Sequence, residues 1–166
     1  MLCRLIEMLI KDKLCVLLVS ALMSIPAVGA NLDETFFLKY QEYSYAQYNL
    51  GLIHYEGRGV RQDYKKAFEW FTKAANQGDS GAQNILGVMY DNGQGVRQDH
   101  YKAKEWYIKA VNQGNAAAQV NLGLMYAKGQ GVRQDYRKAK EWFGLSCDNG
   151  FQRGCDAYKD LNQGGF

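Results

Sequence analysis

The sequence repeats itself at an interval of 36 residues. The string GRGVRQD at 57–63 returns as GQGVRQD at 93–99 and again at 129–135. In the same register, an Ala-Gln pair followed by Leu-Gly recurs in the first half of each unit, and Ala-x-Glu-Trp recurs in the second half. A constant period of this size indicates a repeat array, in which each unit is one supersecondary element that buries its apolar side only by stacking on its neighbours.

Two helices are predicted in each unit, which makes the array all-α. The first helix is expected at 44–56, 80–92 and 116–128. The second carries an apolar stripe at helical spacing, formed in the first unit by Ala67, Trp70, Phe71 and Ala74. Asp63 precedes this helix, where its carboxylate can accept hydrogen bonds from free backbone N–H groups. Gly78 follows it, where glycine can take the left-handed conformation of a C-terminal cap.

A glycine stands in the middle of each predicted first helix, at positions 51, 87 and 123. An internal glycine costs about 1 kcal/mol against alanine, so three glycines in phase need a packing reason. We expect the bulky tryptophans of the second helices to pack where only a hydrogen atom fits, namely Trp70, Trp106 and Trp142. Gly57 and Gly59, with their equivalents, are expected to form the tight turn between the two helices at positive φ.

The first thirty residues differ from the repeat. Lys11 and Lys13 precede an apolar run at 14–28, and small residues follow up to Ala30. This pattern is typical of a signal peptide cleaved after Ala30, and the run is short for a membrane span. An uncleaved inner-membrane anchor is the alternative. We expect residues 1–30 to be removed on export, which places the mature chain in the periplasm or outside the cell.

Export bears on the cysteines that remain after residue 30. Cys147 and Cys155 are the two cysteines of the predicted mature chain, and an oxidising compartment favours a disulfide between them. Cys147 is expected late in the last second helix and Cys155 in a closing helix. The predicted organisation is a capping segment at 31–43, repeats at 44–79, 80–115 and 116–151, and a C-terminal half-repeat cap at 152–166.

Charge and motifs argue against several functions. Without residues 1–30 the chain carries 17 basic and 15 acidic side chains, so it lacks the excess of positive charge typical of a nucleic-acid partner. No metal site or cofactor is predicted, and common serine-enzyme, zinc-protease and phosphate-loop motifs do not occur. His54 and His100 each replace a tyrosine of the other units, so we interpret them as packing residues. No catalytic residue is assigned.

The string Ala-Gln-x-x-Leu-Gly-x-x-Tyr-x-x-Gly-x-Gly-Val-x-x-Asp, followed by Lys-Ala-x-x-Trp, resembles the Sel-one-like repeat (SLR) family, a relative of tetratricopeptide repeats. Residues 82–106 and 118–142 match it in full, and 46–70 match with His54 in place of the usual tyrosine. The resemblance implies a right-handed α/α superhelical solenoid of antiparallel helix hairpins. It implies adaptor or scaffold roles in envelope signalling or host contact, and no common catalytic site. The spacing of Cys147 and Cys155 is similar to that of secreted, cysteine-rich bacterial members.

In such a solenoid the first helices line a concave face, and positions that vary between units are those freed from packing. Tyrosine brings rigid contact area, and asparagine brings an amide able to bond a peptide backbone. We therefore expect a segment of another protein to lie on this face. The alternative is that the capping segment partly covers the tyrosines. The predicted partner-binding residues are Tyr45, Tyr48, Asn49, Leu52, Tyr55, Asn84, Val88, Asp91, Asn121 and Leu124.

The leading functional hypothesis is an exported protein-binding scaffold that uses no cofactor and keeps no membrane span after signal cleavage. Two alternatives stay open. One is weak hydrolysis of a cell-wall or β-lactam substrate, and the other is a purely structural role within an envelope complex. Neither the identity of the partner nor the oligomeric state follows from the sequence.

Overall fold

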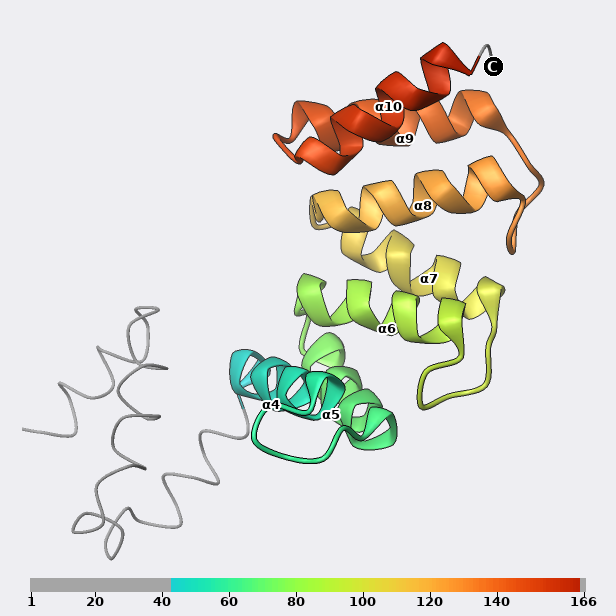
Figure 1. The fold of residues 1–166 in the computed structure, drawn as a ribbon. Coiled ribbons are helices and arrows are strands. Elements are labelled where there is room, and N and C mark those ends of the chain that lie inside the picture. The colour runs from blue at the N-terminus through green and yellow to red at the C-terminus, as the bar shows by residue number, and fades with distance from the viewer. Residues whose placement is uncertain (1–42, 165–166) are drawn as a thin grey trace, which may run out of the picture. The chain divides into compact units, whose positions relative to one another are not determined.

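The computed structural model describes residues 43–164, which form seven α-helices and no strand (Figure 1). The expected signal peptide at 1–30 and nearly all of the expected capping segment at 31–43 lie outside the described residues. The helices are α4 (Ser44–Glu56), α5 (Tyr64–Asn76), α6 (Ser80–Asn92), α7 (His100–Val111), α8 (Ala116–Lys128), α9 (Tyr136–Asp148) and α10 (Gln152–Gln163). The bounds of α4, α6 and α8 agree with the three first helices expected from the repeat.

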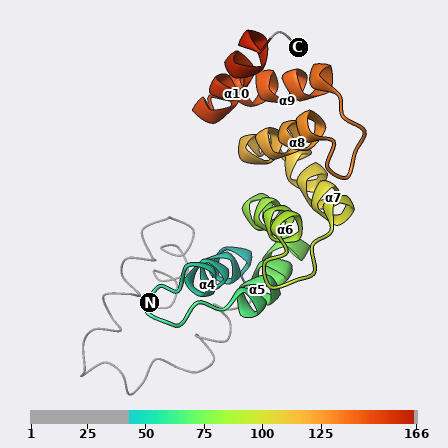
Figure 2. The same cartoon turned by 45° about the vertical axis from the view of Figure 1, so that its right-hand side comes forward.

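Consecutive helices pack as antiparallel hairpins, α4 with α5, α6 with α7 and α8 with α9, and α10 packs on α9. Figure 2 shows the first helices of the units, with α10, along one side of the stack and α5, α7 and α9 along the other. Across the units, α6 also contacts α8, and α8 contacts α10. The expected all-α superhelical solenoid of helix hairpins is therefore confirmed.

Side chains just before helices α5 to α9 satisfy backbone N–H groups that would otherwise lack partners. Asp63 Oδ1 accepts from the N–H groups of Lys65 and Lys66, both at 3.1 Å. The aspartate 36 positions later likewise accepts from two N–H groups of α7, and the one 72 positions later accepts from one N–H group of α9. The bond from the Lys66 N–H lowers the pKa of the Asp63 carboxyl. Because the folded-state pKa is lowered, this stabilisation is present above the unfolded-state pKa and is lost as the pH falls through the folded-state value.

An aromatic ring from the second helix packs against each of the three mid-helix glycines, but it is not the ring of tryptophan. A Cβ atom on Gly51 would lie 2.6 Å from Phe71 Cδ1, and one on Gly123 would lie 2.5 Å from Phe143 Cε1. At Gly87 the colliding ring belongs to Tyr107. The expectation that tryptophan fills this position was wrong by one residue, which corresponds to a rotation of about 100° around the helix.

All three tryptophans are half-buried, and Trp106 and Trp142 pack between units instead. Trp106 contacts the core formed by α5 and α6, and Trp142 contacts the core formed by α7 and α8. Lysine ammonium groups lie over the indole rings, with Lys73 Nζ 4.1 Å from the centroid of Trp70 and Lys109 Nζ 3.9 Å from that of Trp106. These cation–π contacts cover part of the exposed surface of the two rings.

In the second and third units, the second glycine of the turn lies against the unit before it. A Cβ atom on Gly131 would lie 2.7 Å from the carbonyl oxygen of His100, and one on Gly95 would collide with the carbonyl oxygen of Tyr64. Both glycines also have positive φ, 65° and 70°. The turn of one hairpin therefore lies against the backbone at the start of the preceding hairpin's second helix. Gly59 has the same φ of 70°, but no described atom lies within 4 Å of its built Cβ.

This difference gives a matched pair of substitutions. Gly59→Ala and Gly95→Ala carry the same left-handed strain, about 1–2 kcal/mol. Only Gly95→Ala also forces a backbone oxygen away, so we expect it to lower the free energy of unfolding by at least about 1 kcal/mol more. Urea denaturation followed by circular dichroism measures both. Equal losses for the two variants would show that the contact between units does not need glycine.

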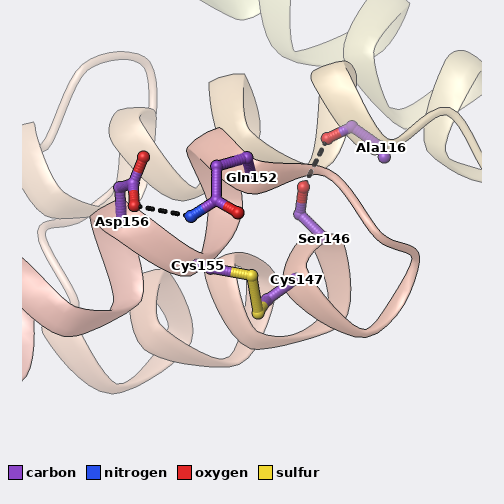
Figure 3. Close-up of a disulfide and its surroundings, with 6 residues drawn as sticks. All are labelled: Ala116, Ser146, Cys147, Gln152, Cys155 and Asp156. Carbon is purple, nitrogen blue, oxygen red and sulfur yellow. Dashed lines mark hydrogen bonds between the residues drawn. A yellow bond between two sulfur atoms is a disulfide. The ribbon is translucent and has the colours of Figure 1, made fainter.

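A disulfide closes the C-terminal end of the array (Figure 3). Cys147 of α9 and Cys155 of α10 are bonded, with their Cα atoms 4.5 Å apart, as expected from the sequence. Beside the bond, Ser146 is buried, and a Cβ on Gly154 would lie 2.6 Å from its Oγ. The two helices therefore approach closely at the point where the disulfide joins them.

Cys155 occupies the repeat position of three buried glutamines, Gln47, Gln83 and Gln119. In each complete unit this glutamine accepts a hydrogen bond from an amide just after the second helix of its own hairpin, at 2.8–3.0 Å. Within the described residues α10 has no second helix of its own. The disulfide supplies a covalent link to α9 at the position where the other units have that hydrogen bond.

Candidate functional site

The candidate binding face is the set of ten residues that the sequence predicts to contact a partner. Its first-unit members Tyr45, Tyr48, Leu52 and Tyr55 are spaced i, i+3, i+7 and i+10, so they share one side of α4. The corresponding members on α6 are Asn84, Val88 and Asp91, and Leu124 holds the same position on α8. These helices form one side of the stack in Figure 2.

Tyr45 is the most accessible aromatic residue of this face, with 47% of its surface exposed. Tyr48 and Tyr55 are half-buried, and their ring centroids lie 5.8 and 6.1 Å from that of Phe71. Leu52 packs against the same core. Burial raises the pKa of the Tyr48 and Tyr55 hydroxyls. Tyr45 is thus available for contact, whereas the other three also support the fold.

Two hydrogen bonds fix the face across unit boundaries. The Tyr55 hydroxyl donates to Gln94 Oε1 in the turn of the second unit, at 2.9 Å. Asn121 Nδ2 on α8 donates to Asn84 Oδ1 on α6, also at 2.9 Å. Because each bond joins side chains from different hairpins, the relative position of the hairpins is set before any partner binds.

The other predicted residues have different surroundings. Val88 and Leu124 are half-buried. Val88 packs against the core formed by α7 and α8, and Leu124 packs against buried residues of α8 and α9. Asn49 Nδ2 is a buried amide nitrogen for which the described structure shows no hydrogen-bond partner. Asp91 Oδ1 lies 2.6 Å from His100 Nδ1, at the end of α6 and the start of α7. His100 was interpreted from the sequence as a packing residue, and its pairing with Asp91 was not foreseen.

Sequence reasoning also missed Tyr101, whose surface is 69% exposed. The repeat contained the signal, since the corresponding residues of the other units are Lys65 and Arg137. An aromatic residue that replaces a solvated cation, without gaining burial, is a candidate contact residue. Among residues 43–164, no group of three or more histidine, cysteine or acidic side chains is arranged to hold a metal ion. In the same range, no helix is long and apolar enough to span a bilayer.

The stacked hairpins and their side-chain face define the chain as an α/α-repeat protein of the scaffold class. The Sel1 repeat family model matches residues 44–79, 80–115 and 116–151, and the chain belongs to this family. Sel1 repeats are generally non-catalytic scaffolds for protein interaction. No curated protein sequence matches the chain.

Two solved structures have similar sequences as well as similar folds. A Sel1 repeat protein from Oxalobacter formigenes is 33% identical with a TM-score of 0.67, over 71% of this chain and 47% of that one. A protective antigen with an SLR fold, present in uropathogenic Escherichia coli strains, is 37% identical with a TM-score of 0.67, over 76% of this chain and 27% of that one. The chain thus spans about half of the first protein and about a quarter of the second.

A third structure shows likeness of fold alone. Helicobacter pylori cysteine-rich protein B has a TM-score of 0.58 and 24% identity, over 77% of this chain and 98% of that one. The disulfide of the present chain is of a kind that forms and persists in oxidising compartments.

Proposed function

We propose that the chain is an exported scaffold that binds a segment of another protein on the candidate binding face, in envelope signalling, assembly or host interaction. The supporting observation is where the units differ. Residues that pack inside the hairpins recur, such as the alanines at 67, 103 and 139. On the face, tyrosine at 45 and 55 becomes glycine and aspartate in the second unit, and alanine at both positions in the third.

This pattern suits an extended ligand that meets different chemistry along the array. The first unit offers aromatic rings, the second offers Asn84 and Asp91, and the third is apolar around Leu124. Tyrosine rings give large, rigid contact area at low entropic cost, and amides bond to peptide groups. A partner segment that crosses all three units can therefore match their side chains in one alignment only.

Export is supported by the disulfide, since such bonds form and persist in oxidising compartments. The signal peptide proposed for residues 1–30 accounts for entry into such a compartment. One similar protein is described as a protective antigen of uropathogenic bacteria, which supports a role in host interaction for the present chain.

Tyr45→Ala tests the face because this side chain is exposed rather than structural. We expect capture of a partner from the organism's own envelope fraction to fall at least tenfold, equivalent to about 1.4 kcal/mol of binding free energy. The free energy of unfolding is expected to change by less than about 0.5 kcal/mol. Quantitative mass spectrometry of the captured proteins and a urea melt provide the two measurements.

The matched control is Ile108→Ala on α7, where another exposed apolar side chain (41%) lies off the face. It should capture the same partner as the unmodified protein. The proposal fails if Tyr45→Ala captures that partner equally well, or if both variants lose it alike.

A further inference from the structure

The second unit departs from the repeat at three positions that the fold brings together. Asp91 stands where the other units have Tyr55 and Ala127, and Tyr101 stands where they have basic residues. His100 replaces a tyrosine found in both other units. Asp91 and His100 are in contact at 2.6 Å, and Tyr101 follows directly in α7.

Replacing tyrosine by histidine leaves space beside the turn. In the first unit, Gln62 Nε2 donates to the Tyr64 hydroxyl at 3.1 Å. In the third unit, Gln134 Nε2 donates to the Tyr136 hydroxyl at 2.8 Å. The second unit has no such hydroxyl, because position 100 is a histidine, and its Nδ1 lies beside Asp91. The side chain at position 100 therefore does not fill the space that the phenol hydroxyl occupies in the other two units.

A hollow of about 540 Å³ lies at this place. The residues of its lining that matter here are Val96, Arg97, His100, Tyr101, Lys102 and Gly131. Its size falls within the range of roughly 300–1,000 Å³ that is usual for ligand sites. It combines an apolar side chain, an exposed aromatic ring and two cations.

The acidic groups at the hollow are already engaged. The Asp91 carboxylate is paired with His100. Asp99 Oδ1 accepts from the backbone N–H groups of Tyr101 and Lys102, both at 3.1 Å, so these helix donors are used as well. The lining therefore holds two exposed cations, Arg97 and Lys102, against one carboxylate, that of Asp99, and this excess of positive charge can attract an anion.

We propose that this hollow is a subsite for an acidic peptide segment that carries an aromatic residue, with carboxylates toward Arg97 and Lys102 and the ring against Tyr101. The proposal rests on the proposed function, since Asp91 belongs to the candidate binding face. It adds the chemical class of the ligand and the unit that selects it.

A synthetic peptide tests the subsite directly. The probe is a dye-labelled peptide in which one phenylalanine is flanked on each side by an aspartate and a glutamate, and its lysine-substituted version is the control. Binding is measured by fluorescence anisotropy. The acidic probe should bind in the micromolar to low millimolar range and weaken as salt is added, and the lysine version should not bind.

The decisive variant carries the third unit's residues, Asp91→Ala with His100→Tyr. The combination of Ala127 with Tyr136 packs in the third unit, so this variant should fold. It restores the phenol ring beside the turn, as in the other two units, and removes the negative charge of Asp91, which by itself would favour an acidic peptide. A loss of affinity of at least tenfold would therefore show that binding depends on the shape of the hollow, and not on the loss of the Asp91 charge.

A second pair separates the local cation from the general charge of the surface. Arg97→Ala should weaken the acidic probe at least fivefold, whereas Arg133→Ala, at the same repeat position one unit later, should leave it unchanged. The subsite is disproved if the unmodified protein does not bind the probe, if the double variant binds as well as the unmodified protein, or if both arginine variants weaken it equally.

These outcomes can be told apart from a failure of the proposed function. If the probe behaves as expected while Tyr45→Ala does not affect partner capture, the subsite stands and the role of the α4 face falls. If Tyr45→Ala abolishes capture but the probe does not bind, the face stands and the subsite falls.

Discussion

Gly123→Ala is expected to lower the free energy of unfolding by about 1–3 kcal/mol, whereas Gly144→Ala is expected to raise it by up to about 1 kcal/mol. Both glycines lie inside helices, where alanine is intrinsically better by about 1 kcal/mol. At Gly123 the new methyl would lie 2.5 Å from Phe143 Cε1 and 3.2 Å from the carbonyl oxygen of Ala139. The cost of overpacking exceeds the gain in helix propensity.

Gly144 faces a site with room. A Cβ there would lie 3.4 Å from Tyr158 Cε2, an ordinary contact with a ring that is itself partly exposed. Only the propensity gain therefore remains. Urea unfolding of the two variants beside the unmodified protein measures the sign of each change. A stabilising Gly123→Ala would mean that the close packing of Phe143 against α8 is not required by the fold.

Removing the disulfide should have an effect of similar size, confined to one end of the array. Replacing Cys147 and Cys155 by serine frees a cross-link between residues eight positions apart. In the chain-entropy account this costs roughly 2–3 kcal/mol. Because repeats interact with their neighbours alone, we expect α10 to open first while α4–α7 stay folded. Hydrogen exchange of the Gln152–Gln163 amides should accelerate strongly.

Reductant provides the control for this prediction. Adding dithiothreitol to the unmodified protein should reproduce the exchange pattern of the double serine variant, and adding it to that variant should change nothing. An equal loss of protection in every helix would contradict the confined opening and would indicate that the array unfolds as one unit.

The helices could be predicted from the sequence because their signals are local and occur three times. The N-capping aspartates at 63, 99 and 135 and the turn glycines fix each helix end within a few residues of chain. The partner of the mid-helix glycines could not be predicted, because Trp70 and Phe71 are adjacent and both large. Which of them faces α4 depends on how the hairpin is rotated, and that rotation is set by the whole stack.

The candidate site was accessible to sequence reasoning only in part. Variation between units drew attention to Tyr48 and Tyr55, but it could not reveal that both rings also pack near Phe71. The bond between Asn121 and Asn84 depends on the offset between successive hairpins, which no single unit encodes. The sequence shows that His100 replaces a tyrosine of the other units, but its contact with Asp91 is seen only in the structure.

The backbone contact made by Gly95 and Gly131 bears on how such a chain changes length during evolution. Each of these turns lies against the start of the second helix in the preceding unit, at Tyr64 for Gly95 and at His100 for Gly131. Duplication or loss of a whole 36-residue unit would recreate the same contact at the new junction. An insertion of any other length within α4–α9 would put the wrong backbone atoms face to face. Selection can therefore vary the number of modules far more readily than their size.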